Sequence, residues 1–212
     1  MGFFEALERR ARQADSLLCV GIDPRGTDPA TVREECLRLV DATAGHACAF
    51  KPNSAFFEAL GEDGMTVLRD VIARVPDAIP VILDAKRGDI ADTAEAYATA
   101  AFDRLGAQAI TLSPYLGGEA LRPFLARPER GAFVLCKTSN PGADEFQALR
   151  TGDAALFEVV ARHAQEWDVH GNVGLVVGAT DPEALARARA AAPALWFLVP
   201  GVGAQGGDLR AA

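Results

Sequence analysis

The sequence predicts an α/β protein built from repeated strand–helix units, with the architecture of a TIM-type (β/α)8 barrel. Apolar runs of about five residues alternate along the chain with helical segments of about ten residues or more. Polar or glycine-rich residues follow each apolar run at its C-terminal end, where such barrels place their functional groups. Nothing in the sequence resembles a linker, so residues 1–212 are expected to form a single barrel domain.

Seven strands are expected, each a short apolar stretch bounded by turn residues. A strand opens at Val81, and the others cover residues 17–22, 47–50, 109–112, 132–136, 173–177 and 195–199. A short helix is expected after Gly118, and longer helices over residues 3–14, 31–40, 54–75 with a break near 61–64, 92–105, 153–167 and 182–192. No eighth strand is visible before Ala212, so we expect the barrel to be incomplete at its C-terminal end.

Charge and composition argue against several classes of function. A formal net charge of −8 and a pI near 4.9 do not suit a surface for nucleic acid or anionic membranes. The sequence has no signal-peptide core and no apolar run of about 18 residues, so no membrane span is expected. The 4 cysteines form no C-x-x-C pair, and the 3 histidines have no ligand-like spacing with them. We therefore expect free thiols in a reducing cytoplasm and no metal site.

The stretch over residues 81–93, VILDAKRGDIADT, holds the densest group of candidate catalytic side chains. Asp84 and Lys86 are two positions apart, so on an extended chain their side chains leave the same face. Asp89 follows after a glycine turn, where the chain enters an alanine-rich helix. These groups are expected to converge at the C-terminal end of a strand. A helix cap at Asp89 beside a surface Asp84–Lys86 ion pair explains the same pattern.

Motifs along the whole chain resemble those of one enzyme family. Beside VILDAKRGDIADTAEAYA, they are CVGIDP, FKPNSAFFEALG, SPYLGG, VLCKTSNPGA, GNVGLVVGAT and LVPGVGAQGGD. They are similar to those of orotidine 5′-monophosphate decarboxylase, specifically its second bacterial subfamily. The resemblance implies decarboxylation of orotidine 5′-monophosphate to uridine 5′-monophosphate and CO2, the last step of de novo pyrimidine synthesis. It also implies a homodimer with shared active sites, and the cysteines and charge described above indicate a cytoplasmic protein that binds neither nucleic acid nor membrane.

The family's functional residues are carried over by position. Its lysine–aspartate tetrad falls on Lys51, Asp84, Lys86 and Asp89. The residues implied to bind substrate are Asp23, Thr93, Thr138, Ser139, Gly203, Gln205 and Gly206. Among them, Asp23 and Lys51 match ribose contacts, and Ser139 matches the residue that recognises the pyrimidine. The loop over residues 203–206 matches one side of the phosphate site. By the same resemblance, Asp89 and Thr93 serve the site of the neighbouring subunit.

The chemistry implied for these residues requires no metal or other cofactor. Loss of CO2 from the pyrimidine leaves a carbanion at ring carbon six. A protonated Lys86 at that carbon stabilises the charge and then donates its proton. The lysines keep the aspartates ionised and the aspartates keep Lys86 protonated, and the tetrad sums to zero charge.

Two alternatives stay open at the level of sequence. Magnesium-dependent sugar-phosphate decarboxylases and aldolases of the same superfamily share the aspartate–lysine pattern, but they have a glutamate where this chain has Lys51. The second alternative is a truncated fragment of the decarboxylase that is weakly active or inactive. In the family, the segment after Asp208 completes the barrel and supplies an arginine that grips the phosphate. On this interpretation the chain is poorly stable, since unpaired strand edges remain.

Overall fold

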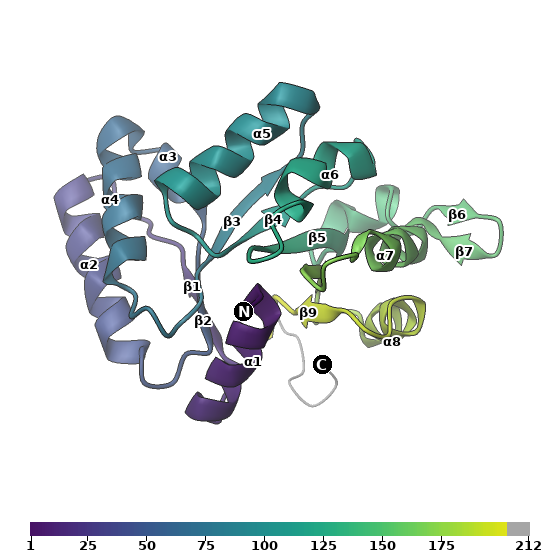
Figure 1. Cartoon of the computed structure of the whole chain (residues 1–212), viewed down its shortest axis with the longest axis horizontal. Coiled ribbons are helices and arrows are strands. Elements are labelled where there is room, and N and C mark those ends of the chain that lie inside the picture. Colours follow the sequence, from purple (N-terminus) through teal and green to yellow (C-terminus); the bar gives the residue numbers. More distant parts are fainter. Residues whose placement is uncertain (203–212) are drawn as a thin grey trace.

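Parallel strands form the inner layer of the fold, and helices pack around them (Figure 1). The structure, a computed structural model, describes residues 1–202. One parallel pair consists of β1 (Cys19–Ile22) and β2 (Ala49–Pro52). A parallel sheet follows, with the order β3 (Ile82–Arg87), β4 (Ala109–Leu112), β5 (Gly131–Lys137), β8 (Val173–Val177) and β9 (Trp196–Leu198). Isolated parallel bridges, Phe50 to Val81 and Asn53 to Asp84, join β2 to β3.

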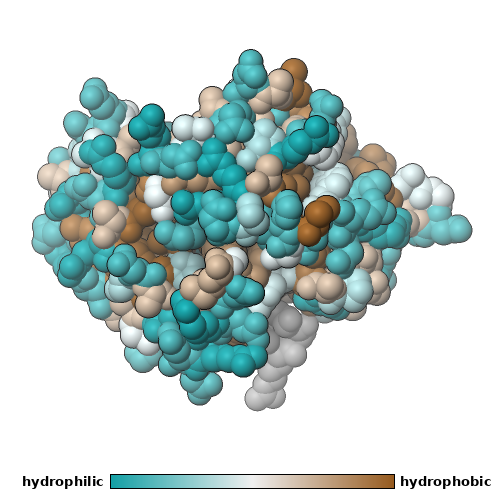
Figure 2. Space-filling model, in the orientation of Figure 1, coloured by the Kyte–Doolittle hydropathy of each residue, from teal (hydrophilic) through white to brown (hydrophobic). Residues whose placement is uncertain are grey.

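The helices alternate with these strands along the chain. They are α1 (Phe3–Ala14), α2 (Pro29–Thr43), α3 (Ser54–Glu58), α4 (Gly61–Arg74), α5 (Ala91–Thr99), α6 (Gly118–Leu125), α7 (Leu156–Trp167) and α8 (Pro182–Ala191). In Figure 1, α2 and α4 lie beside β1 and β2, whereas α7 and α8 lie at the opposite end of the sheet. Figure 2 shows a mainly hydrophilic face with small, separate apolar areas. Within residues 1–202, no helix has the length and apolar character needed to cross a membrane.

The apolar core has an outer and an inner part. The outer part packs the strands against the surrounding helices, with Phe50, Phe57 and Ile110 fully buried. The inner part lies between α1 and the strands, where Phe3 and Phe4 contact Phe133 in edge-to-face geometry. Helix α1 therefore closes one end of the strand layer.

Local sequence explains the boundaries of several helices. The Asp28 carboxylate accepts a hydrogen bond of 2.8 Å from the Thr31 N–H, and Pro29 occupies the first turn of α2. The helix over residues 54–75 is interrupted as predicted, but the break between α3 and α4 lies at Ala59 and Leu60, and residues 61–64 form the first turn of α4. At Gly64, a Cβ atom would lie 2.0 Å from the Phe57 carbonyl oxygen, so only glycine permits this close packing of the two helices.

Every strand expected from the sequence is present, and the parallel strand–helix order confirms the predicted α/β class. The predicted helix over residues 153–167 is too long, because its start belongs to a hairpin of β6 (Arg150–Thr151) and β7 (Ala154–Ala155). Gly152 has a φ of +63° in this turn, which favours the hairpin over a helix. The predicted helix over residues 92–105 consists of two parts in the structure, the α-helix α5 and a π-helical turn over Ala100–Arg104.

Strand β2 lies two residues later than predicted, because it begins at Ala49 and continues through Pro52 instead of covering residues 47–50. Pro52 lacks an N–H, but it is the last residue of the strand and pairs in register with Ile22. The next N–H, from Asn53, donates to the Ile22 carbonyl at 3.2 Å. The pairing of β1 with β2 thus extends past Lys51 and holds it in the sheet.

Candidate active site

The Asp84 carboxylate is the centre of a charged cluster at the C-terminal end of the sheet. Its Oδ2 accepts a hydrogen bond of 2.7 Å from Lys51 Nζ, and its Oδ1 accepts one of 2.6 Å from Lys86 Nζ. A third hydrogen bond, from Thr111 Oγ1 to Oδ1, measures 2.9 Å. We call Lys51, Asp84 and Lys86 the lysine–aspartate cluster. Neighbouring strands β2 and β3 supply it, so the parallel register brings together residues far apart in sequence.

The two lysines of the cluster differ in exposure. The Lys51 side chain is 16% exposed, whereas that of Lys86 is 49% exposed. The sequence contains only one other lysine, Lys137, and every other residue of the Lys and Arg class is an arginine. An ammonium group can lose its proton during a reaction and an arginine cannot, so the use of lysine here suits proton transfer. Lys86 is the most exposed side chain of the cluster.

Charge keeps the Asp84 carboxylate ionised. Burial alone would raise the pKa of Asp84. The positive charge of Lys51 and the hydrogen bonds from Lys51 and Lys86 outweigh burial, so the pKa of Asp84 is lower than its ordinary value. Nearby Cys19 behaves differently: burial raises its pKa to about 12, and the charge of Lys51 offsets this only in part. The Cys19 thiol is therefore neutral at physiological pH.

A bulge in β3 determines the backbone conformation of Lys86. The β3–β4 pairing shifts between Leu83 and Arg87, and Lys86 has a φ of +48°, in the left-handed region. The Arg87 carbonyl then accepts a hydrogen bond of 2.8 Å from the Ser113 N–H. At Gly88, a Cβ atom would lie 2.7 Å from the Ser113 carbonyl oxygen. The glycine therefore allows the chain to pass close to the end of β4 before entering α5.

Asp89 does not join the lysine–aspartate cluster of its own chain. Its Oδ1 accepts a hydrogen bond of 2.8 Å from the Ile90 N–H, and no ion pair among residues 1–202 links it to Lys51 or Lys86. The alternative of Asp89 as the helix cap is wrong, because the residue that caps α5 is Ile90, without a side-chain bond. Thr93, in the first turn of α5, is exposed.

The other predicted residues lie after β1 and β5. Asp23 follows β1 and is exposed. Thr138 follows β5, where its N–H and hydroxyl bind the Gln147 amide, with a 2.8 Å bond from the N–H to Oε1. Ser139 comes next and is half-buried. The predicted residues Gly203, Gln205 and Gly206 lie outside the described part of the chain.

Sequence reasoning missed Thr111, which is 1% exposed and bonded to the cluster's carboxylate. Its position in the apolar run of β4 hid it, because a single threonine there is compatible with ordinary sheet packing. The available signal was a hydroxyl group on the strand next to the one that carries Asp84 and Lys86. That placement becomes informative only once the strand register is known.

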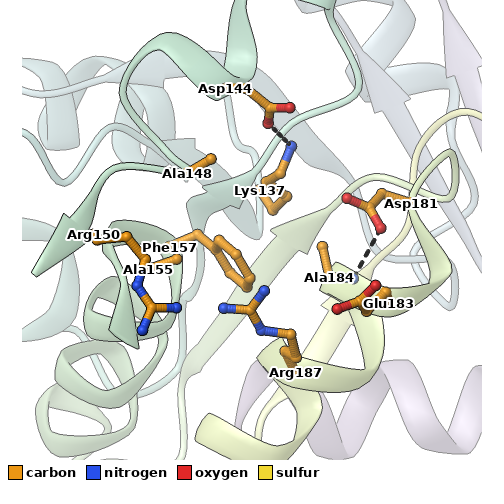
Figure 3. Close-up of a pocket in the computed structure, with 10 residues that line it drawn as sticks. All are labelled: Lys137, Asp144, Ala148, Arg150, Ala155, Phe157, Asp181, Glu183, Ala184 and Arg187. Carbon is orange, nitrogen blue, oxygen red and sulfur yellow. Dashed lines mark hydrogen bonds and ion pairs between the residues drawn. The ribbon is translucent and has the colours of Figure 1, made fainter. Parts of the chain in front are cut away.

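A cavity of about 180 Å³ lies apart from the lysine–aspartate cluster (Figure 3). Lys137, Asp144, Arg150 and Arg187 are among its lining residues. The Lys137 side chain is 8% exposed, and its Nζ binds Asp144 Oδ1 at 2.9 Å. Positive and negative side chains both line the cavity, so it has no dominant charge. Its Lys137–Asp144 ion pair ties β5 to the 3-10 turn over Pro141–Glu145.

Comparison with known proteins gives a consistent family. The family model described as "Orotidine 5'-phosphate decarboxylase / HUMPS family" matches residues 16–212. An orotidine 5′-phosphate decarboxylase of Roseiflexus castenholzii is 52% identical, over 100% of this chain and 81% of that protein. That of Azoarcus sp. is 49% identical, over 100% of this chain and 82% of that protein.

Solved structures agree with these relatives. The OMP decarboxylase of Leishmania donovani is 59% identical with a TM-score of 0.93, over 95% of this chain and 80% of that chain. The UMP synthase of the same organism is 60% identical with a TM-score of 0.97. In that case all of this chain is covered, but it spans only 47% of the UMP synthase chain. The predicted resemblance and the TIM-type barrel class are thereby confirmed.

Proposed function

Since the chain belongs to the orotidine 5′-phosphate decarboxylase / HUMPS family, we propose that it converts orotidine 5′-monophosphate to uridine 5′-monophosphate and CO2. The observation that carries this proposal is the lysine–aspartate cluster, in which Lys86 is half-exposed and bonded to an ionised Asp84. Each oxygen of the Asp84 carboxylate accepts a hydrogen bond from one of the two lysines, so the cluster is held in place before substrate binds. Such preorganisation suits electrostatic catalysis.

The proposed reaction needs one proton and no electron acceptor. The bond between ring carbon six and the carboxylate breaks, CO2 leaves, and the electron pair stays on ring carbon six. The Lys86 ammonium stabilises this carbanion and donates a proton to it, which forms the C–H bond of the product. Lys86 then regains a proton from solvent, which its exposure permits.

Lys51 argues against a magnesium-dependent reaction of the kind that other enzymes with this fold catalyse. A magnesium site needs carboxylate oxygens, whereas Lys51 places an ammonium 2.7 Å from Asp84 Oδ2. The cation occupies the oxygen that a metal would use. We therefore propose a reaction that continues in the presence of EDTA.

We further propose a cytoplasmic homodimer in which Asp89 and Thr93 complete the site of the partner subunit. Two lysines and one aspartate leave the cluster with a net charge of +1, and a second carboxylate would neutralise it. Asp89 makes no ion pair to these lysines within the described chain. Beside it, Ile90 is 55% exposed, so an apolar side chain is available for an interface. The free cysteines suit a reducing compartment.

The remaining substrate contacts follow from the family resemblance and the positions of the residues. Asp23 lies at the end of β1, next to the strand that carries Lys51, and is proposed to bind the ribose. Thr138 and Ser139 follow β5; Ser139 is proposed to bind the pyrimidine, and Thr138 is proposed to contact the substrate beside it. Gly203, Gln205 and Gly206 are proposed to contact the phosphate.

The test is the ultraviolet absorbance change on adding orotidine 5′-monophosphate with EDTA present. We expect turnover by the wild-type chain and a loss of at least about 10³-fold for Lys86→Ala, since it removes both the charge and the proton donor. Arg12→Ala is the control, because this cation lies on α1 with a 79% exposed side chain. No turnover by the wild-type chain, or retained turnover by Lys86→Ala, would contradict the proposal.

A further inference from the structure

We propose that Thr111 is a positioning residue for the active site, because its hydroxyl group holds the irregular segment of β3 that presents Lys86. This inference deepens the proposed function and rests on it. Thr111 belongs to β4 and is 1% exposed, so it is screened from solvent. It acts through Asp84 and through the backbone of Ala85 and Lys86.

The β3–β4 register explains why a side chain is needed there. Leu83 pairs with Ile110, and Arg87 pairs with Leu112. Three residues of β3 therefore lie opposite the single residue Thr111 of β4. The peptide N–H groups of this bulge cannot all follow the regular pairing with β4. Buried N–H groups must find another acceptor, or they cost about 1–3 kcal/mol each.

Thr111 Oγ1 supplies that acceptor. The Ala85 N–H donates to it at 3.1 Å and the Lys86 N–H donates to it at 2.9 Å. A hydroxyl oxygen has two lone pairs, so both are now occupied. Its one hydrogen must then be donated, and Asp84 Oδ1 lies 2.9 Å away. The hydroxyl group thus fixes the bulge and the carboxylate orientation together.

The backbone conformation of Lys86 depends on these hydrogen bonds. A φ of +48° is unfavourable for a residue with a side chain and persists only when its surroundings hold it. The hydrogen bond from the Lys86 N–H anchors the backbone beside this angle. The Lys86 ammonium is in turn held 2.6 Å from Asp84 Oδ1, the oxygen that Thr111 also binds. Loss of the hydroxyl group would free the Lys86 N–H and remove one of the hydrogen bonds that orient the Asp84 carboxylate.

Two substitutions separate the hydroxyl group from side-chain volume. Thr111→Val keeps the shape and loses the hydroxyl, whereas Thr111→Ser keeps the hydroxyl and loses a methyl group. We expect Thr111→Val to lower kcat about 10- to 100-fold, since small displacements of a reacting group have effects of this size. Its KM should change less than about 3-fold, because the substrate contacts remain. Thr111→Ser should retain more than about half of the wild-type kcat.

Asn172→Ala controls for simple loss of stability. The Asn172 side chain, 1% exposed, donates to the carbonyl groups of Leu125, Arg127 and Arg130, away from the proposed site. We expect this variant to lower Tm while the folded enzyme keeps its kcat. A Thr111→Val enzyme with wild-type kcat, or a Thr111→Ser enzyme as impaired as Thr111→Val, would overturn the inference.

Hydrogen exchange gives a readout that does not depend on turnover. Without the hydroxyl acceptor, the Ala85 and Lys86 amides of Thr111→Val should exchange at least about 10-fold faster than in the wild-type chain. Thr111→Ser and Asn172→Ala should leave the ratio of these two rates to other β3 amides unchanged. Unchanged exchange in Thr111→Val would overturn the inference even if the wild-type chain is active. An inactive wild-type chain would overturn the proposed decarboxylation, whereas the exchange rates still decide the role of Thr111.

Discussion

Asp84 couples the charge of the candidate active site to the stability of the fold. Its folded-state pKa is lowered, because the charge and hydrogen bonds of the lysines outweigh burial. A lowered pKa means that its carboxylate stabilises the fold above the unfolded-state pKa, which is about 3.9. That contribution disappears as the pH falls through the folded-state value.

Asp84→Asn tests this linkage, because asparagine does not titrate. We expect the wild-type free energy of unfolding to exceed that of the variant most above about pH 4, and the difference to shrink as the pH falls further. Urea denaturation of both proteins at a series of pH values measures this difference. A difference that stays constant down to about pH 3 would contradict the assigned direction of the pKa shift.

At the level of single residues, the sequence predicted the charged groups of the site but not the buried hydroxyl group that hydrogen-bonds to them. Asp84 and Lys86 were predicted to meet because they are two apart on one strand, and their 2.6 Å contact confirms this. Thr111 was not predicted, since its role depends on a bulge in β3 that no periodicity reveals. Polar side chains at strand ends are visible in sequence, whereas hydroxyl groups inside apolar strands resemble packing residues.

Helix α1 is the element whose packing closes one end of the strand layer. Phe4 stacks on Trp196 of β9 with ring centroids 6.0 Å apart, and it meets Phe133 of β5 edge to face. At Gly131, where β5 begins, a Cβ atom would lie 2.3 Å from the Phe3 ring. The glycine therefore makes room for the helix. Strands that are distant in sequence share α1 as a common support.

Phe4→Ala should therefore destabilise the whole fold. Phe4 is 7% exposed, and truncation of a buried phenylalanine costs about 3–5 kcal/mol. Denaturant unfolding measures this loss. Leu17→Ala is the matched control, because Leu17 is 79% exposed and its truncation should cost less than about 0.5 kcal/mol. A loss of less than about 1 kcal/mol for Phe4→Ala would show that α1 is not a major support.

Elements were predicted best where periodicity and turn residues agree. The expected start and end of α1, Phe3 and Ala14, match the structure, because its apolar residues follow the helical period. The hairpin of β6 and β7 was missed, since each strand has only 2 residues and shows no alternation. Its Gly152 turn is the feature that separates it from the helix that follows.

At the scale of the whole molecule, the proposed dimer explains why the cluster has an excess positive charge in a single chain. If Asp89 serves the partner's site, a dimer of Lys86→Ala with Asp89→Ala contains one site with both substitutions and one intact site. Each variant alone has no intact site. Complementation in mixed dimers therefore distinguishes a shared site from a site within one chain.

We expect both single variants to be strongly impaired, and an equal mixture, unfolded and refolded together, to regain about a quarter of the wild-type rate. Random pairing yields half heterodimers, each with one intact site of two. Absorbance turnover assays, with size-exclusion chromatography and light scattering, measure rate and oligomeric state. No recovery in a mixture shown to contain heterodimers would exclude the shared site, as would a monomeric wild-type chain with full activity.

The sequence by itself determined the α/β class, the order of strands and helices, and the family, because these depend on local periodicity and on motifs that are contiguous in the chain. It also indicated which charged groups end the strands. Only the tertiary structure decided that Lys51 and Lys86 bind opposite oxygens of Asp84, that Thr111 holds the bulge, and that Asp89 stays apart. The reason is physical. Strand register and side-chain direction are set by packing between distant segments, and a shift of one residue would turn each side chain to the other face.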